Sequence, residues 1–338
     1  MALPKDKIEK IALQVIKVLW KRFSTFPEDA SGIRNAPFHT AFLNAFRANL
    51  EEHVSDIPVF ISLSSWFHGL NTTLGQSFFE KVAHILCDGE KREFRNLRFS
   101  QQQQSAVSEI VTALKNGQEK PNLLRENTLV FCNNTPQDRE VANFSVDCYY
   151  EDTNSIVAIE LKTVRPNSGV FKNEKDKMLS AKAGLKNNYP NKDIFYYLAF
   201  PFDPLSDTPT GSDKPRFMQH SVDFTKFIAP DEVLLADELW DFLSGNTETM
   251  QQILDIINVI ATTDFQDKYG FINDPQNREN DWAEYLRQLD EWKLFSEIAW
   301  LDIVRQKQQK STALIRKLNL SLFDSKGEYK DDRLDCSE

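Results

Sequence analysis

The stretch of sequence that decides the fold runs from Phe144 to Lys162 and reads FSVDCYYEDTNSIVAIELK. Residues 144–150 and 156–164 are predicted to be strands, because both are rich in β-branched and aromatic residues. A run of turn formers, EDTNS, separates them, so the pattern predicts a β-hairpin. If the turn itself is Thr153 and Asn154, the antiparallel register places Asp147 opposite Glu160.

Asp147 and Glu160 would repel each other in such a hairpin, because opposed side chains lie about 5 Å apart at Cβ. A divalent cation bound between the two carboxylates would reverse that repulsion. Side chains alternate along a strand, so Lys162 shares the face of Glu160. Two carboxylates and an ammonium on one face are typical of a metal-dependent phosphodiesterase, although an exposed, charged strand edge would give the same pattern.

The composition is that of a globular chain and sets limits on its class and compartment. With 338 residues, of which 41% are hydrophobic, the chain is long enough to bury a sizeable core. It has no run of the roughly 18 apolar residues that a membrane span needs, and its first residues lack the layout of a signal peptide. The four cysteines are scattered without a CxxC pair, which argues against a zinc site or a disulfide framework and predicts a cytoplasmic protein.

The net charge of −10 would disfavour DNA binding if it were spread evenly, but it is not. Residues 229–302 hold 17 acids against 4 bases, as on the solvated side of a helical layer. Residues 160–192 hold 8 bases against 3 acids, and residues 303–318 add five bases and no acid. DNA binding depends on local basic surface, since charges are screened beyond a Debye length of about 10 Å. The overall charge therefore neither supports nor excludes a nucleic-acid partner.

The rest of the chain is predicted to be mainly helical. Helices are expected where apolar residues recur at helical spacing, at residues 5–23, 38–53, 74–87, 101–114 and 173–186, and from 238 onward. Strands are expected at 129–132 and 193–200, short strand or turn elements at 224–227 and 233–235, and loops at 64–71, 166–169 and 201–216. Because no clear linker interrupts the chain, we expect one compact unit with a helical part at 1–63, a core at 64–228 and a mainly helical part at 229–338.

Two longer runs carry a resemblance to a known family. Residues 66–80 read WFHGLNTTLGQSFFE, and residues 160–169 read ELKTVRPNSG. Together with the Asp147…Glu-Leu-Lys pattern, they make residues 64–200 resemble type II restriction endonucleases of the PD-(D/E)XK nuclease superfamily. The resemblance is strongest to a branch that cuts short G/C-rich palindromes. One departure is that Ser145-Val146 stands before Asp147, where the superfamily often has a proline.

The resemblance implies the fold, the metal and the reaction. The implied fold is α/β, with a restriction-endonuclease-like mixed central sheet flanked by helices. The implied reaction is the Mg²⁺-dependent hydrolysis of phosphodiester bonds in double-stranded DNA. Lys162 would assist the attacking water, and the Mg²⁺ ligands would be Asp147, Glu160, Glu80 and the backbone carbonyl of Leu161.

Glu80 has a second interpretation. It is the position that matches the helical glutamate of many PD-(D/E)XK enzymes, and it shares a predicted helix face with Gln76 and His84. Ser77 and Glu80 also fit a helix capping box, which would give the carboxylate a purely structural role. His84 is expected to be a helix-face residue only.

DNA contacts are predicted on the residues that follow Lys162, because exposed donors there reach phosphates or base edges. The predicted contacts are Arg165, Asn167, Ser168 and Lys172 in an exposed segment, and Lys175, Lys182 and Lys186 on the helix that follows it. The helix lysines are also what a merely solvated, charged face would show. The residues 303–318 are the other basic segment that we consider for recognition. A palindromic site has two-fold symmetry, so a homodimer is expected.

Two other functions stay open on the sequence alone. A sequence-nonspecific DNA-repair nuclease of the same fold would often carry helicase motifs or a cysteine cluster, and the sequence shows neither. A catalytically inactive DNA-binding module would usually lose an acid or the lysine, and this chain keeps them all.

Overall fold

The computed structural model describes residues 2–27, 43, 57–132, 135–162, 168–307 and 311–334. The chain divides into two units, residues 1–3 with 79–253 and residues 4–78 with 254–338. The division suggested by the sequence, with boundaries after residues 63 and 228, remains a prediction. Among the described helices, none combines the length and the apolar character that crossing a membrane requires.

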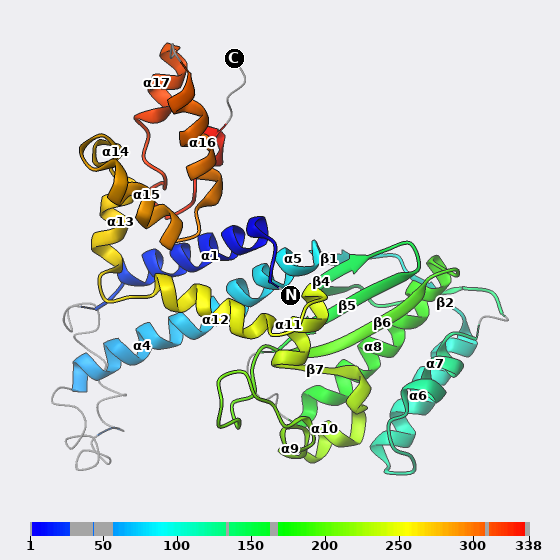
Figure 1. Ribbon diagram of the computed structural model, residues 1–338. Coiled ribbons are helices and arrows are strands. Elements are labelled where there is room, and N and C mark those ends of the chain that lie inside the picture. The colour runs from blue at the N-terminus through cyan, green and yellow to red at the C-terminus, as the bar shows by residue number, and fades with distance from the viewer. Residues whose placement is uncertain are drawn as a thin grey trace. The chain divides into compact units, whose positions relative to one another are not determined.

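The first unit is built on a mixed five-stranded sheet (Figure 1). In spatial order its strands are β1 Glu90–Phe94, β4 Phe144–Glu151, β5 Ser155–Leu161, β6 Asp193–Phe200 and β7 Val233–Leu235. The β1–β4 and β4–β5 pairs are antiparallel, whereas the β5–β6 and β6–β7 pairs are parallel. Helices flank this sheet, so the predicted α/β class and the mixed sheet are confirmed.

The hairpin of β4 and β5 has the register that the sequence predicts. Its pairs run from Glu151–Ile156 to Cys148–Ile159, which leaves Thr153 and Asn154 as the turn. Asp152 Oδ1 accepts hydrogen bonds from the amides of Asn154 and Ser155, both at 2.7 Å. This side-chain cap explains why a short polar run reverses the chain here.

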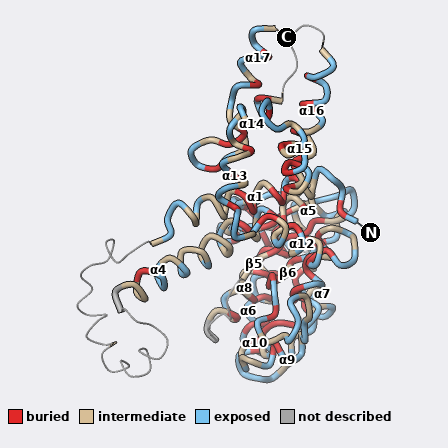
Figure 2. The backbone as a smooth tube through the Cα atoms, turned by 60° about the vertical axis from the view of Figure 1, so that its left-hand side comes forward, coloured by how far each residue is buried: buried red, intermediate tan, exposed pale blue. Residues whose placement is uncertain are grey.

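Helices cover both faces of the sheet. The covering helices are α5 Phe79–Cys87, α8 Ser168–Asn188, α10 Val222–Phe227 and α11 Asp237–Ser244. Two residues of β6 show which helix lies on which face. They are three positions apart, so their side chains point to opposite sides of the sheet. Phe200 packs on Phe224 of α10, whereas Tyr197 packs edge-on against Phe242 of α11. The buried residues accordingly gather along β5 and β6 (Figure 2).

The remaining elements of the first unit test further predictions. They are β2 Arg98–Phe99, α6 Gln101–Lys115, α7 Leu123–Val130, β3 Arg139–Glu140, α9 Lys214–Gln219 and the 3₁₀ turn η4 Pro230–Glu232. The helix predicted at 101–114 is confirmed, and Ser100 and Gln103 form its capping box. The strand predicted at 129–132 is wrong, because Asn122 caps a helix that ends at Val130. Residues 224–227, predicted as a strand or turn, belong to α10.

The described part of the second unit is almost entirely helical. Its helices are α1 Lys5–Phe23, α4 Ile57–Thr73, the π-helical turn η3 Leu74–Phe78, α13 Phe265–Asn273, α14 Pro275–Asn280, α15 Trp282–Glu291, α16 Phe295–Gln306, α17 Thr312–Leu318 and the 3₁₀ turn η5 Asp331–Leu334. Helix α12 Thr249–Ile260 runs across the boundary between the units. The helix at 5–23 is confirmed, whereas the loop predicted at 64–71 is wrong because α4 includes these residues. The helix predicted at 38–53 lies outside the described residues, except for Leu43.

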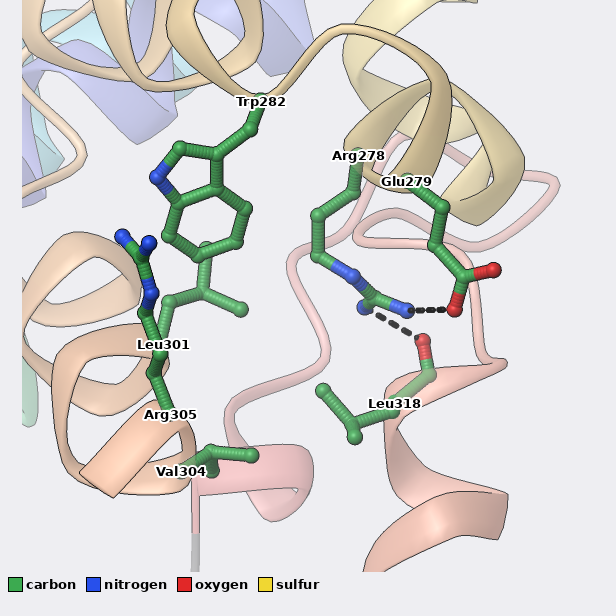
Figure 3. A pocket seen from close by; sticks show the side chains of 7 residues that line it. All are labelled: Arg278, Glu279, Trp282, Leu301, Val304, Arg305 and Leu318. Carbon is green, nitrogen blue, oxygen red and sulfur yellow. Dashed lines mark hydrogen bonds and ion pairs between the residues drawn. The ribbon is translucent and has the colours of Figure 1, made fainter. Parts of the chain in front are cut away.

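The basic segment 303–318 forms parts of two helices, the end of α16 and all of α17. A pocket of about 330 Å³ lies among α14, α15, α16 and α17 (Figure 3). The Arg305 guanidinium lies over the Trp282 ring, 5.2 Å from its centroid. Arg278 is buried and donates to the carbonyl of Leu318 at 2.8 Å. This hydrogen bond ties α14 to the end of α17 within the second unit.

Candidate active site

The last pair of the β4–β5 hairpin is Cys148–Ile159. Continued by one position, this register places Asp147 opposite Glu160 at the end of the hairpin. Beyond the Cys148–Ile159 pair, the Asp147 carboxylate accepts a hydrogen bond from the Leu161 amide at 2.9 Å. On the other side of β4, the pairing with β1 is irregular, so that Lys91 alone opposes Asp147 and Cys148. Such a bulge twists a strand locally and re-aims its side chains.

Lys91 joins two of the acids that the sequence singles out. Its Nζ lies 3.1 Å from Glu80 Oε2 and 3.4 Å from Asp147 Oδ1. Glu80 therefore lies beside Asp147, and its carboxylate accepts from Lys91. The capping-box interpretation is wrong, because Ser77 lies inside η3, which joins α4 directly to α5, and the Glu80 carboxylate bonds to Lys91. Partial burial would lower the pKa of Lys91, but the Glu80 and Asp147 carboxylates outweigh it and raise the pKa.

Two further contacts fasten α5 to the strand that carries Asp147. His84 Nε2 donates to the Asp147 carbonyl at 2.7 Å, so this residue does more than occupy a helix face. The Cys87 and Cys148 sulfur atoms lie 3.4 Å apart as free thiols. The described cysteines, Cys87, Cys132 and Cys148, are free thiols.

A second cluster of charges surrounds Glu160 and Lys162. The two side chains share a face as predicted, with Lys162 Nζ donating to Glu160 Oε1 at 2.8 Å. Helix α8 adds two residues that the sequence interpretation missed. Glu174 Oε1 lies 2.8 Å from Lys162 Nζ, and Lys177 Nζ lies 2.7 Å from Glu160 Oε2. The four side chains are between 12% and 25% exposed, so the cluster is partly accessible to solvent.

The charges of this cluster stabilise one another. Burial would raise the pKa of Glu160, but the Lys162 and Lys177 ammonium groups outweigh it and hold the pKa below its ordinary value. Burial would lower the pKa of Lys162, but the Glu160 and Glu174 carboxylates outweigh it and raise the pKa. Lys162 is therefore a firmly charged ammonium at neutral pH.

The oxygen donors of the site fit a hard divalent cation. Asp147, Glu160 and Glu80 offer only carboxylate oxygens, and Leu161 offers a backbone carbonyl, which is the ligand set that Mg²⁺ prefers. In the described part of the chain, no three His, Cys, Asp or Glu side chains converge as a metal-binding group. Ammonium groups lie against these carboxylates, and Lys91 contacts both Glu80 and Asp147. Each acid thus already meets a positive charge, and the metal ligands remain a prediction.

The segment predicted to contact DNA is described only in part. Arg165 and Asn167 lie outside the described residues, as does the side chain of Ser168, which opens α8. Lys172 is half-buried and lines a pocket of about 360 Å³ together with Asn143, Asn173 and Lys177. Lys172 therefore stays a predicted DNA contact.

The structure contradicts the predicted DNA contacts of Lys175 and Lys182. Both are fully buried, where Lys175 pairs with Glu126 and Glu232 and Lys182 pairs with Glu232. An ammonium sealed among carboxylates inside the protein cannot reach a DNA phosphate. Lys186 donates to the backbone carbonyl of Lys192 at 2.8 Å, and its phosphate contact remains a prediction.

Comparisons with known proteins agree on one family. Residues 3–261 match the family described as Type II restriction endonuclease, HinfI. The chain is 41% identical, over 357 aligned residues, to the Type II restriction enzyme MjaII of Methanocaldococcus jannaschii. That alignment covers 98% of this chain and 96% of the relative. No solved structure matches the chain.

Proposed function

Because the chain belongs to the HinfI family of type II restriction endonucleases, we propose that the end of the β4–β5 hairpin is its catalytic centre. The chain is a site-specific deoxyribonuclease, so the site must hydrolyse a phosphodiester bond of DNA. One observation carries the assignment. Lys162 pairs with Glu160 at the end of β5, the Asp147 carboxylate on β4 accepts from the amide of Leu161 between them, and Lys91 contacts both Asp147 and Glu80.

The proposed cofactor is Mg²⁺, held by Asp147, Glu160 and the Leu161 carbonyl, with Glu80 joining directly or through water. Bound Mg²⁺ supplies a water of lowered pKa and neutralises charge that develops on the phosphate. The ammonium groups of Lys91 and Lys162 form ion pairs with these carboxylates, which supports them as ligands of a cation. Lys91, with 53% of its side chain exposed, is free to move off Asp147 toward a phosphate.

Lys162 is proposed to act as a cation and hydrogen-bond donor. Its neighbouring carboxylates raise its pKa, so it holds its proton when it meets the substrate. An ammonium in this position orients the attacking water and stabilises the negative charge of the transition state.

The proposed substrate is double-stranded DNA with a short, G/C-rich palindromic site, bound by a homodimer. We propose that Arg165, Asn167 and Ser168 read the bases, because they directly follow the catalytic Lys162 in sequence. Lys172 and Lys186 are proposed to contact phosphates. Two-fold symmetry of the site calls for two copies of the chain, each cutting one strand.

Digestion of plasmid DNA by the purified protein tests this proposal. With Mg²⁺ we expect discrete fragments, which a restriction map of the plasmid assigns to one repeated palindrome. With EDTA in place of Mg²⁺ we expect intact plasmid. A smear would indicate a nonspecific nuclease, and binding without cleavage would indicate an inactive DNA-binding module. Either result would overturn the proposal.

A further inference from the structure

Two charged side chains of helix α8 lie at the hairpin site but have no role in the proposed reaction. Glu174 and Lys177 lie three residues apart, and therefore on one face of the helix. Glu174 contacts Lys162 and Lys177 contacts Glu160, and Lys162 and Glu160 contact each other. The four side chains thus form an unbroken chain of alternating charge.

We infer that Glu174 is a positioning residue for Lys162, and that Lys177 is one for Glu160. The inference rests on the proposed function of the hairpin site. A lysine side chain has four rotatable bonds, and fixing it costs conformational entropy. A second carboxylate, approaching from a helix on the sheet face, fixes the ammonium before the substrate arrives.

Glu160 alone would hold Lys162 poorly in the working enzyme. A carboxylate that also serves a divalent cation shares its negative charge with that cation and holds an ammonium less firmly. Glu174 is not a proposed metal ligand, and its Oε1 lies as close to Lys162 Nζ, 2.8 Å, as Glu160 Oε1 does. Glu174 therefore keeps Lys162 in place when Glu160 has a second partner.

The other oxygen of Glu174 is a candidate binding site for a water molecule. Glu174 Oε2 is buried and accepts no hydrogen bond from any described residue. A buried carboxylate oxygen without a donor destabilises the protein, so such oxygens usually bind water. Because Oε1 of the same carboxylate holds Lys162, a water bound to Oε2 would lie near the ammonium.

The position of Glu174 is itself fixed by its neighbour in sequence. Lys175 is fully buried and pairs with Glu126 of α7 and Glu232 of η4. These ion pairs set the rotation of α8 about its axis, and so aim Glu174 and Lys177 at the hairpin. Precise support of this kind is what a catalytic group needs, because small misplacements cost large factors in rate.

Single-turnover cleavage by Glu174→Gln tests the inference, with Asp176→Asn as the matched control. Asp176 lies on the same helix, is exposed, and forms no ion pair with a described residue. We expect Glu174→Gln to cleave about 10–100-fold more slowly, as is usual when a supporting partner is removed. The dissociation constant for DNA without divalent cation should stay close to that of the wild type, and Asp176→Asn should cleave at the wild-type rate.

A double-mutant cycle shows whether Glu174 acts through Lys162. In a Lys162→Gln background, the further change Glu174→Gln should have little effect on the residual rate. NMR of the side-chain ammonium groups in the metal-free protein gives a readout independent of cleavage. There the Lys162 ammonium signal, protected from exchange in the wild type, should broaden in Glu174→Gln.

A wild-type cleavage rate for Glu174→Gln, or its full effect in the Lys162→Gln background, would overturn the inference. If Glu174→Gln does not fold, Glu174→Asp decides, because it keeps the charge on a shorter arm. An intermediate rate for Glu174→Asp supports the positioning role, and a wild-type rate overturns it. If the wild type itself does not cleave DNA, the proposed function fails and the inference falls with it, whereas a normal rate in the variant alone removes only the inference.

Discussion

Helix α8 takes part in two charge clusters that contain the same residue types and differ in their access to solvent. The buried cluster consists of Lys175, Lys182, Glu126 and Glu232, with side chains no more than 1% exposed. The site cluster consists of Glu160, Lys162, Glu174 and Lys177, which are partly accessible to solvent and border a pocket at Lys177. The same residue types therefore form a sealed ion-pair cluster in one place and a partly accessible one, our proposed catalytic site, in the other.

Burial also changes how each cluster holds its protons. In the buried cluster the balance is divided: burial raises the pKa of Glu126 and lowers the pKa of Lys182, whereas at Glu232 the two lysines outweigh burial and lower the pKa. In the site cluster, the partners outweigh burial, and the pKa of Glu160 is lowered while the pKa of Lys162 is raised. Desolvation therefore prevails at two members of the buried cluster, whereas ion pairing prevails at Glu160 and Lys162 of the site cluster.

Removing one lysine from each cluster should destabilise the protein to very different extents. We expect Lys175→Met to destabilise the protein by about 3–5 kcal/mol, because it leaves buried carboxylates uncompensated. The same substitution at Lys162 should cost no more than about 1 kcal/mol, as for a partly exposed ion pair. Urea denaturation of both variants at neutral pH makes the comparison. Equal losses in the two variants would show that burial does not distinguish the clusters.

Glu80 tests how far the catalytic site extends beyond the hairpin. Glu80→Gln should lower the single-turnover rate by about 10–100-fold, since it removes a supporting acid beside Asp147. Glu109→Gln, an exposed acid on α6, is the matched control and should cleave normally. A wild-type rate for Glu80→Gln would confine the site to Asp147, Glu160 and Lys162.

Lys172 is expected to show the smallest effect, on DNA affinity alone. Lys172→Ala should weaken binding to cognate and scrambled duplexes alike, and lower the slope of log affinity against log salt by about one. Lys115→Ala, an exposed lysine on α6, should leave the slope unchanged. Arg165→Ala should instead reduce the discrimination between the two duplexes. If Lys172→Ala changes neither binding nor its salt dependence, Lys172 does not contact DNA, and the basic residues of α16 and α17 become the next candidates.

The sequence predicted the hairpin and the pairing of its charges because both follow from local patterns. The turn formers set the register, and alternation along β5 put Glu160 and Lys162 on one face. Contacts between distant parts of the chain left no such pattern. Lys91 and Glu174 reach the site from β1 and α8, and only the fold shows that they do. Strand β1 was itself missed, because its sequence, EKREF, is mostly charged and exposed.

The burial of Lys175 and Lys182 had a signal in the sequence that was not used. Phe171, Lys175, Met178, Lys182 and Leu185 follow one another at helical spacing, and all are fully buried. Two lysines interleaved with large apolar residues on one helix face lie on the core side of that helix. The periodicity could thus have shown that these lysines are not phosphate contacts, although their partners Glu126 and Glu232 could not be found without the structure.

The central claim is that Asp147, Glu160 and Lys162 form the catalytic centre, and single-turnover cleavage by their alanine variants tests it most directly. Each change removes a group from the proposed metal centre, which typically costs several orders of magnitude in rate. We expect Asp147→Ala, Glu160→Ala and Lys162→Ala each to abolish cleavage with Mg²⁺, while binding to the cognate duplex is largely retained. Near-wild-type cleavage by any one of these three variants would contradict the account.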